Sequence, residues 1–148
     1  RKLHLVYSVS PHRVMEVNGE EVVNQYETPT ETDWGYGYLR GGASPVLHRG
    51  CYYHFFHGMM ERDPGERLYT LGLAVFEAKP PFRILKITNI PLDEGDATTN
   101  PGISSDVIFP GGAVFLRDQW AIAMGVHDTW SEVRFYSDRY VESMLTAV

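Results

Sequence analysis

The side chains best suited to chemistry are one arginine and two histidines, whose spacing suggests a repeated unit. Arg40 directly precedes Gly41, and the same 70 residues separate Gly41 from Gly111 and His57 from His127. A guanidinium can hold a carboxylate, a phosphate or sugar hydroxyls through parallel hydrogen bonds, and an imidazole can exchange a proton near neutral pH. Repeats of this size are typical of propellers and solenoids. We therefore expect Arg40 and both histidines to line one cavity.

Asp128, which directly follows His127 at the end of an apolar stretch, is a further candidate. Its carboxylate could bind vicinal sugar hydroxyls. Each of these residues also has an ordinary structural explanation. Arg40 could form a structural ion pair, the histidines could be satisfied by backbone carbonyls in an aromatic core, and Asp128 could be a turn residue. The residue types alone leave both explanations open.

Other chemistries have weaker support in the sequence. His54 and His57 are three positions apart, so on a strand they point to opposite faces and would not share a zinc ion. Cys51 has no neighbour that would activate its thiol. Dinucleotide-binding, Walker and Gly-x-Ser-x-Gly motifs are absent from the sequence. We expect neither a metal site nor an organic cofactor.

Composition limits the class of protein and its partners. At 148 residues, with 13% aromatic residues, the chain suits one folded, strand-rich domain. The net charge of −6 without a basic run argues against a nucleic-acid partner. No apolar segment approaches the roughly 20 residues that span a bilayer, and the single cysteine favours a cytoplasmic location. Because the chain starts at Arg1 rather than methionine, we expect that processing or truncation has removed earlier residues.

Alternating and apolar runs predict a chain made mostly of antiparallel strands. Residues 22–37 mix a proline, threonines, acidic residues and a tryptophan, and are predicted to form a long loop that lies over a site. Residues 93–105 are predicted as an exposed connection and 141–148 as the one short helix. The predicted strands span residues 3–10, 13–17, 44–48, 51–60, 68–78, 82–90, 107–116, 120–126 and 133–136.

The order of these strands fits the blades of a β-propeller. Four strands precede a long connection, after which the Gly-Gly motif appears again. The predicted units are part of a blade in residues 1–37, without its innermost strand, a blade in 38–92 and a blade in 103–148. A β-sandwich of seven or more strands is the alternative that composition does not exclude.

A family resemblance rests on residues 7–13 (YSVSPHR), 39–45 (LRGGASP), 53–57 (YHFFH), 69–72 (YTLG), 80–81 (PP), 109–113 (FPGGA) and 125–128 (GVHD). With these motifs the chain resembles glycoside hydrolase family 130, the mannoside phosphorylases and mannosidases, which are five-bladed β-propellers. The resemblance covers nearly the whole chain in order and corresponds to the later half of such a propeller. It therefore implies an all-β propeller fold whose upstream blades are missing.

The resemblance also implies roles for individual residues. It places Arg40, His57 and Tyr69 in a pocket that holds phosphate or water near the scissile bond. It places Asp128 at the sugar of the −1 subsite, with His127 beside it as a second sugar-binding candidate. Inorganic phosphate is the co-substrate that this pocket would take.

The chain departs from the family pattern in three ways. Thr70 stands where a basic residue often follows the tyrosine, which would weaken an anion site, and Val126-His127-Asp128 stands where Gly-Ala-Asp is common. The general-acid aspartate of the family would lie upstream of the residues present. Because glycosidic cleavage needs such an acid, no residue of this chain is assigned a catalytic role.

The sequence thus predicts a carbohydrate-active propeller of the glycoside phosphorylase or hydrolase type, acting on β-mannoside-type oligosaccharides and incomplete without further blades. Whether the chain is itself an enzyme stays open. A non-catalytic carbohydrate-binding propeller, associated with a glycosyltransferase, is the first alternative, and a structural interaction module is the second. We expect a partner chain or the missing blades to cover the exposed sheet faces.

Overall fold

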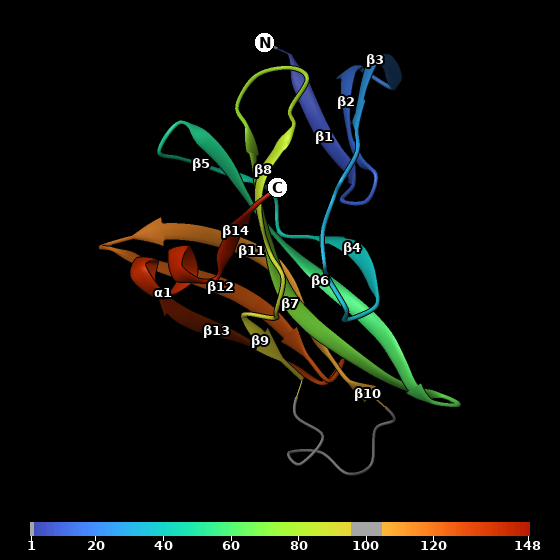
Figure 1. Cartoon of the computed structure of the whole chain (residues 1–148), viewed down its shortest axis with the longest axis vertical. Coiled ribbons are helices and arrows are strands. Elements are labelled where there is room, and N and C mark those ends of the chain that lie inside the picture. The colour runs from blue at the N-terminus through green and yellow to red at the C-terminus, as the bar shows by residue number, and fades with distance from the viewer. Residues whose placement is uncertain (1, 96–104) are drawn as a thin grey trace.

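A computed structural model describes residues 2–95 and 105–148 of the chain (Figure 1). Strands dominate it, as the aromatic composition predicts. The one helix in the described ranges is α1 (Asp138–Ser143). The strands are β1 (Leu3–Ser8), β2 (His12–Asn18), β3 (Glu21–Thr28), β4 (Tyr38–Gly42), β5 (Val46–His48), β6 (Cys51–Asp63), β7 (Glu66–Glu77), β8 (Ile84–Thr88), β9 (Asp93–Glu94), β10 (Ser105–Asp106), β11 (Ile108–Leu116), β12 (Gln119–Val126), β13 (Trp130–Ser137) and β14 (Leu145–Ala147).

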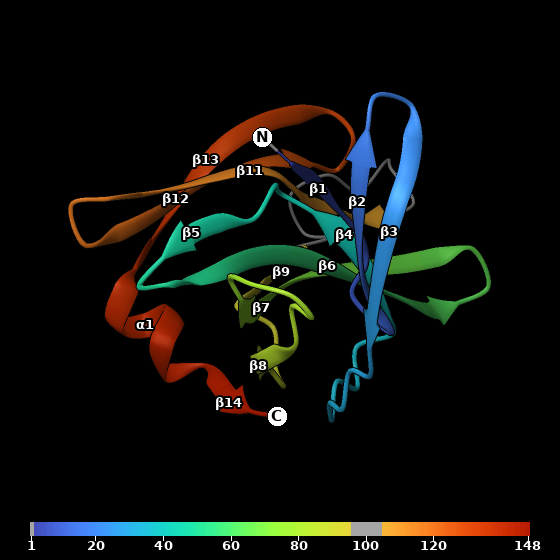
Figure 2. The same cartoon turned by 90° about the horizontal axis from the view of Figure 1, so that it is seen from above.

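The strands form three separate sheets, which Figures 1 and 2 show as successive units along the chain. The first sheet has the order β1-β2-β3 and the last has the order β11-β12-β13. The middle sheet has the order β14-β8-β7-β6-β4, and the short strands β5, β9 and β10 pair along β6 and β7. Neighbouring strands within each sheet are antiparallel, apart from the parallel pair of β10 with β7.

The middle sheet is buried on both faces, because successive side chains of its two long strands point to opposite sides. On one face Phe55 and Leu73 join a core with Trp120 of the last sheet. On the other face Phe56 joins a core with Val14 of the first sheet. Each sheet therefore stacks on the next, as blades of a propeller do, whereas a sandwich would consist of two sheets only.

Both copies of the Gly-Gly motif form a β-bulge in the first strand of their sheet. The pairing register of β4 with β6 shifts at Gly41, and that of β11 with β12 shifts at Gly111. A bulge residue is left out of the ladder and bends the strand, which glycine tolerates well. The 70-residue spacing of the glycines therefore reflects a real structural repeat.

The equal spacing of the histidines does not reflect that repeat, and this prediction is wrong. Arg40 pairs with His57 across β4 and β6. At the corresponding place in the last sheet, Pro110 pairs with Met124. His127 lies three residues further on, beyond the end of β12, whereas His57 lies inside the long strand β6. The two histidines thus occupy different positions in their sheets.

Two element predictions need correction. Residues 22–37 were expected to be loop, but β3 covers the first part and pairs with β2 from His12 to Asn18. The cause is that β3 is an edge strand with mostly exposed residues, such as Val22 and Val23, and so lacks the usual alternation. The predicted helix over 141–148 lies earlier, at α1, because the Ser137 hydroxyl caps it by accepting from the Tyr140 N–H.

The C-terminal strand β14 does not extend the last sheet but pairs with β8 in the middle sheet. The expected exposed connection at 93–105 contains β9, Gly95 and the start of β10, and residues 96–104 lie outside the described ranges. The blade boundaries at 37–38 and 92–103 stay predictions. Among the described helices none is long and apolar enough to cross a bilayer.

A polar network around α1 ties the last sheet to the middle sheet. The Asp138 carboxylate accepts the Trp120 indole N–H at 3.1 Å and an N–H of Arg49 at 2.6 Å. Tyr53 donates its hydroxyl to Glu142 at 2.6 Å. Because Trp120 belongs to β12 whereas Arg49 and Tyr53 belong to the middle unit, this network fixes how the two sheets stack.

Candidate functional site

Three of the predicted site residues lie together on one face of the middle sheet. Arg40 of β4 and His57 of β6 are directly opposite each other in the ladder, so their side chains share a face. The ring of Tyr69 in β7 stacks against the His57 ring with 5.7 Å between centroids. The ring of Phe109, which belongs to β11 of the last sheet, contacts the His57 ring with 4.7 Å between centroids. We call Arg40, His57, Tyr69 and Phe109 the Arg40 cluster.

The protonation of His57 is set by its surroundings. Its Nδ1 lies 2.6 Å from the carbonyl oxygen of Gly41, the bulge residue of β4. Since a carbonyl only accepts, Nδ1 carries the proton and Nε2 presents a lone pair. Burial lowers the pKa of His57, the positive charge of Arg40 lowers it further, and the contact with Gly41 opposes both. The ring is therefore neutral at neutral pH.

Arg40 is exposed at the edge of this face. Within the ranges that the structure describes, its guanidinium has no ion pair or hydrogen bond. The structural ion pair that the sequence left open is therefore not formed with any described residue. A guanidinium in this position can bind a ligand without first breaking an internal contact.

His127 and Asp128 form the turn between β12 and β13, with φ values of 50° and 54° in the left-handed region. His127 is buried, and its Nδ1 accepts the backbone N–H of Val107 at 3.3 Å. The backbone N–H of His127 donates to the Val107 carbonyl at 2.8 Å. These contacts support the structural explanation of His127, while Asp128 is exposed and accessible to a ligand.

Phe109 connects this turn to the Arg40 cluster. Its ring contacts His57, and along the ladder it pairs with Gly125, two residues before His127. Asp128 thus lies in the turn of the β12–β13 hairpin, and β12 also pairs with the strand that contains Phe109. The structure places Arg40 beside His57 in the ladder and stacks Tyr69 on His57, while the turn with His127 and Asp128 belongs to the last sheet.

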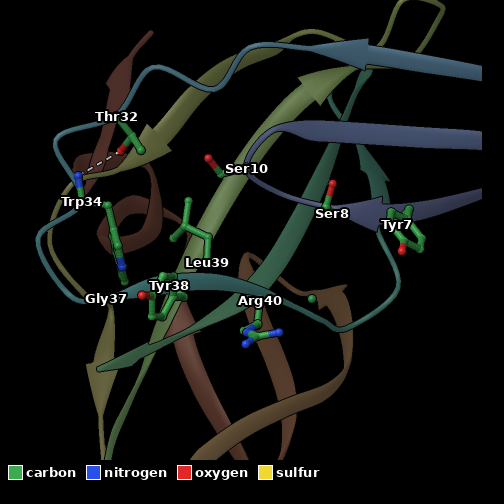
Figure 3. A pocket seen from close by; sticks show the side chains of 10 residues that line it. Tyr7, Ser8, Ser10, Thr32, Trp34, Gly37, Tyr38, Leu39 and Arg40 are labelled. Atoms are coloured by element: carbon green, nitrogen blue, oxygen red, sulfur yellow. Dashed lines mark hydrogen bonds between the residues drawn. The ribbon is translucent and has the colours of Figure 1, made fainter. Parts of the chain in front are cut away.

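A cavity of about 670 Å³ runs along the free edge of β4 (Figure 3). Arg40 and Tyr38 project to the opposite side of β4 from Leu39. Thr32 and Trp34 come from the part of the predicted loop that is not strand, and the Thr32 hydroxyl accepts the Trp34 backbone N–H at 3.2 Å. The residues that line this cavity are Tyr7, Ser8, Ser10, Thr32, Trp34, Gly37, Tyr38, Leu39, Arg40 and Gly41.

Sequence reasoning missed three residues of this region. Tyr38 is 72% exposed and stands two positions before Arg40, so strand periodicity alone could have placed it on the same face. Trp34 lies in a segment without periodicity. Phe109 was assigned to a strand, but its contact with His57 depends on how two sheets stack, for which the sequence gives no local signal.

A second cavity, of about 940 Å³, lies between the first and middle sheets and is lined in part by His54. His54 and the nearby His12 are both buried, and burial lowers the pKa of each to about 4. Both rings are therefore neutral at neutral pH. Among the described residues, no group of three or more His, Cys, Asp or Glu side chains could hold a metal ion.

Comparisons with protein-family models and with curated proteins find no match. Among solved structures, the chain is similar to β-1,2-mannobiose phosphorylase from Listeria innocua, determined in complex with β-1,2-mannobiose, with a TM-score of 0.64 and 17% sequence identity. The similarity covers 97% of this chain and 45% of that one, so the chain spans less than half the length of the structure that it matches. At this identity the likeness concerns the fold. The chain is all-β and of the propeller type, with a fold like that of glycoside hydrolase family 130.

Proposed function

We propose that this chain is part of a carbohydrate-active propeller of the glycoside phosphorylase or hydrolase type, which acts on β-mannoside-type oligosaccharides. The observation that carries the proposal is the Arg40 cluster, in which a guanidinium without a partner among the described residues stands beside a neutral histidine. A fold like that of a mannobiose phosphorylase supports the choice of sugar.

The cluster supplies the kinds of contact that a sugar or a phosphate needs. Arg40 donates to phosphate oxygens or sugar hydroxyls, and Nε2 of His57 accepts from a hydroxyl. Tyr69 and Phe109 offer aromatic faces beside these groups. In this proposal Asp128 contacts a sugar from the adjacent turn, and His127 holds the shape of that turn.

A second candidate function is carbohydrate binding without cleavage. Within the described residues, the groups that interact with His57 are the Gly41 carbonyl, Arg40, Tyr69 and Phe109, and none of them is a carboxylate. Since glycosidic cleavage uses a carboxylic acid beside the leaving oxygen, this chain alone favours binding. Cleavage would require an acid from elsewhere in the propeller.

The outer faces of the first and last sheets expose apolar side chains. Leu5 and Tyr7 are exposed on the first sheet, and Val133 and Phe135 are exposed on the last. Such apolar faces usually meet a partner. Because the chain spans 45% of the structure that it matches, we propose that further sheets of the same propeller cover both faces.

Titration of the full chain with β-1,2-mannobiose and with inorganic phosphate tests the proposal. Arg40→Ala should weaken binding at least about tenfold, the value of one hydrogen bond to a charged group. Arg139→Ala is the matched control, because Arg139 is an exposed arginine on α1. Unchanged binding by the Arg40 variant would refute the site. Release or uptake of phosphate with manno-oligosaccharides would separate the enzyme from the binding protein.

A further inference from the structure

His48 lies where the middle sheet meets the last sheet. It ends β5 and is followed by a two-residue turn, Arg49 and Gly50, whose φ values of 49° and 79° are both positive. Such turns are favoured in tight hairpins and fix the direction of the residues beside them. The imidazole packs against the rings of Phe115 and Trp120 in the last sheet, with 4.1 Å and 5.3 Å between centroids. The turn therefore holds a titratable ring at the junction of two sheets.

The Nε2 atom of His48 is buried and has no hydrogen-bond partner among the described residues. Oδ1 of Asp138 lies 3.8 Å away, which is beyond hydrogen-bond distance. The two side chains are only 13% and 11% exposed, so water screens their interaction weakly. A small movement of the ring would bring Nε2 and Oδ1 into contact.

We propose that His48 forms an acid-dependent contact between the middle and last sheets: when the ring takes up a proton from solvent, Nε2–H donates to Asp138 and strengthens the stacking. Both nitrogens of an imidazolium are donors, and its hydrogen bond to a carboxylate is charge-assisted. Histidine is the side chain that ordinarily exchanges a proton between about pH 5 and 8. The inference goes beyond the proposed function, because it concerns how the sheets are held together.

The charged and titratable groups around His48 come from α1, from β6 and from the turn after β5, while β11 and β12 contribute uncharged rings. They are Asp138, Glu142, Tyr53, Cys51 and Arg49. Glu142 already accepts from Tyr53 at 2.6 Å and from Lys86 at 3.4 Å. Asp138 is therefore the carboxylate that His48 can engage.

The Asp138 carboxylate has room for a third donor. Arg49 donates to Oδ2 at 2.6 Å, and the Trp120 indole N–H donates to Oδ1 at 3.1 Å. A carboxylate offers about four acceptor positions on its two oxygens. Oδ1 can therefore accept from His48 without losing Trp120.

Urea unfolding of the full chain and of His48→Gln, at about pH 8 and about pH 5.5, tests the inference. The glutamine amide stays uncharged at both pH values, and the effects of His12 and His54 cancel in the comparison. Because the folded chain binds the His48 proton more tightly than the unfolded chain, the extra stability is present in acid and lost as the pH rises. The unfolding constant of the variant relative to the wild type should rise at least about threefold on acidification. An unchanged ratio would overturn the inference.

Asp138→Asn is the matched control, because it keeps the shape of the side chain and removes its charge. In this background the effect of His48→Gln should no longer depend on pH, as expected for two directly coupled residues. A pH dependence that persists without the Asp138 charge would also overturn the inference.

NMR of the unmodified chain gives a readout that does not depend on a variant that folds. Because Trp120 and His48 share Oδ1 of Asp138, the Trp120 indole N–H signal should shift as His48 titrates. The shift should be absent in His48→Gln and reduced in Asp138→Asn. A Trp120 signal that stays unchanged while His48 titrates would refute the proposed contact.

Discussion

Replacing Asp138 should loosen the stacking of the last sheet on the middle sheet. Its buried carboxylate accepts the Trp120 indole N–H at 3.1 Å and an Arg49 N–H at 2.6 Å. Asp138 also lies in the first turn of α1, where a negative charge interacts favourably with the helix dipole. Asp138→Ala removes all three interactions at once.

The cost can be worked out contact by contact. The Trp120 side chain is fully buried, so its N–H without a partner costs about 1–3 kcal/mol. The Arg49 side chain is 57% exposed, so its ion pair is screened and contributes about 0–1 kcal/mol. Loss of the helix-dipole interaction adds about 0.3–1 kcal/mol. We therefore expect Asp138→Ala to lower the free energy of unfolding by about 1.3–5 kcal/mol.

Urea unfolding followed by tryptophan fluorescence measures this change. Asp138→Asn keeps an oxygen for the Trp120 N–H and loses only the charge, so it should cost about 1 kcal/mol. Arg49→Ala should cost no more than about 1 kcal/mol. If Asp138→Ala proved as mild as Arg49→Ala, the Trp120 contact would contribute nothing and the reasoning would fail.

Two further predictions concern the opposite face of the middle sheet. Gly58→Ala should lower the free energy of unfolding by about 1–3 kcal/mol, because a Cβ would lie 2.6 Å from Thr70 Oγ1 and 2.9 Å from Trp34 Nε1. Urea unfolding measures this loss of stability. A variant as stable as the wild type would contradict the packing around Gly58. Because the pKa of His12 and of His54 falls from 6.5 to about 4 on folding, the unfolded chain takes up protons first as the pH drops. The contribution of the two neutral histidines to the free energy of unfolding should therefore be complete above pH 6.5 and fall by on the order of 3 kcal/mol per histidine towards pH 4. In His54→Leu the fall of stability with pH should be smaller by the contribution of one histidine. A variant with the same dependence of stability on pH as the wild type would contradict this prediction.

Much of the scaffold could be predicted because its signals are local. The alternation in residues 3–10 corresponds to β1, and the apolar runs of 51–60 and 68–78 correspond to β6 and β7. The double burial of β6 and β7 explains why those runs are apolar throughout rather than alternating. The sequence pattern thus predicts the observed strand where every residue of that strand is packed against a neighbour.

The elements that escaped prediction depend on distant contacts. β3 is an exposed edge strand that exists through its ladder with β2. β14 has three residues, and its pairing with β8 joins segments far apart in the sequence. No local periodicity marks either of them, so only the tertiary structure assigns them to a sheet.

The repeated motif shows why sequence spacing predicted the scaffold better than the site. Both Gly-Gly bulges are real, but the residues paired beside them differ: Arg40 with His57 in the middle sheet, Pro110 with Met124 in the last. In the middle sheet the carbonyl of the bulge residue, Gly41, receives a histidine N–H. The bulge therefore supplies a backbone acceptor that fixes the tautomer of His57, and the side chains at the paired positions decide whether that geometry has a chemical use. A repeat in glycines thus specifies where a site can form, and the cross-strand partner of each copy determines whether it does.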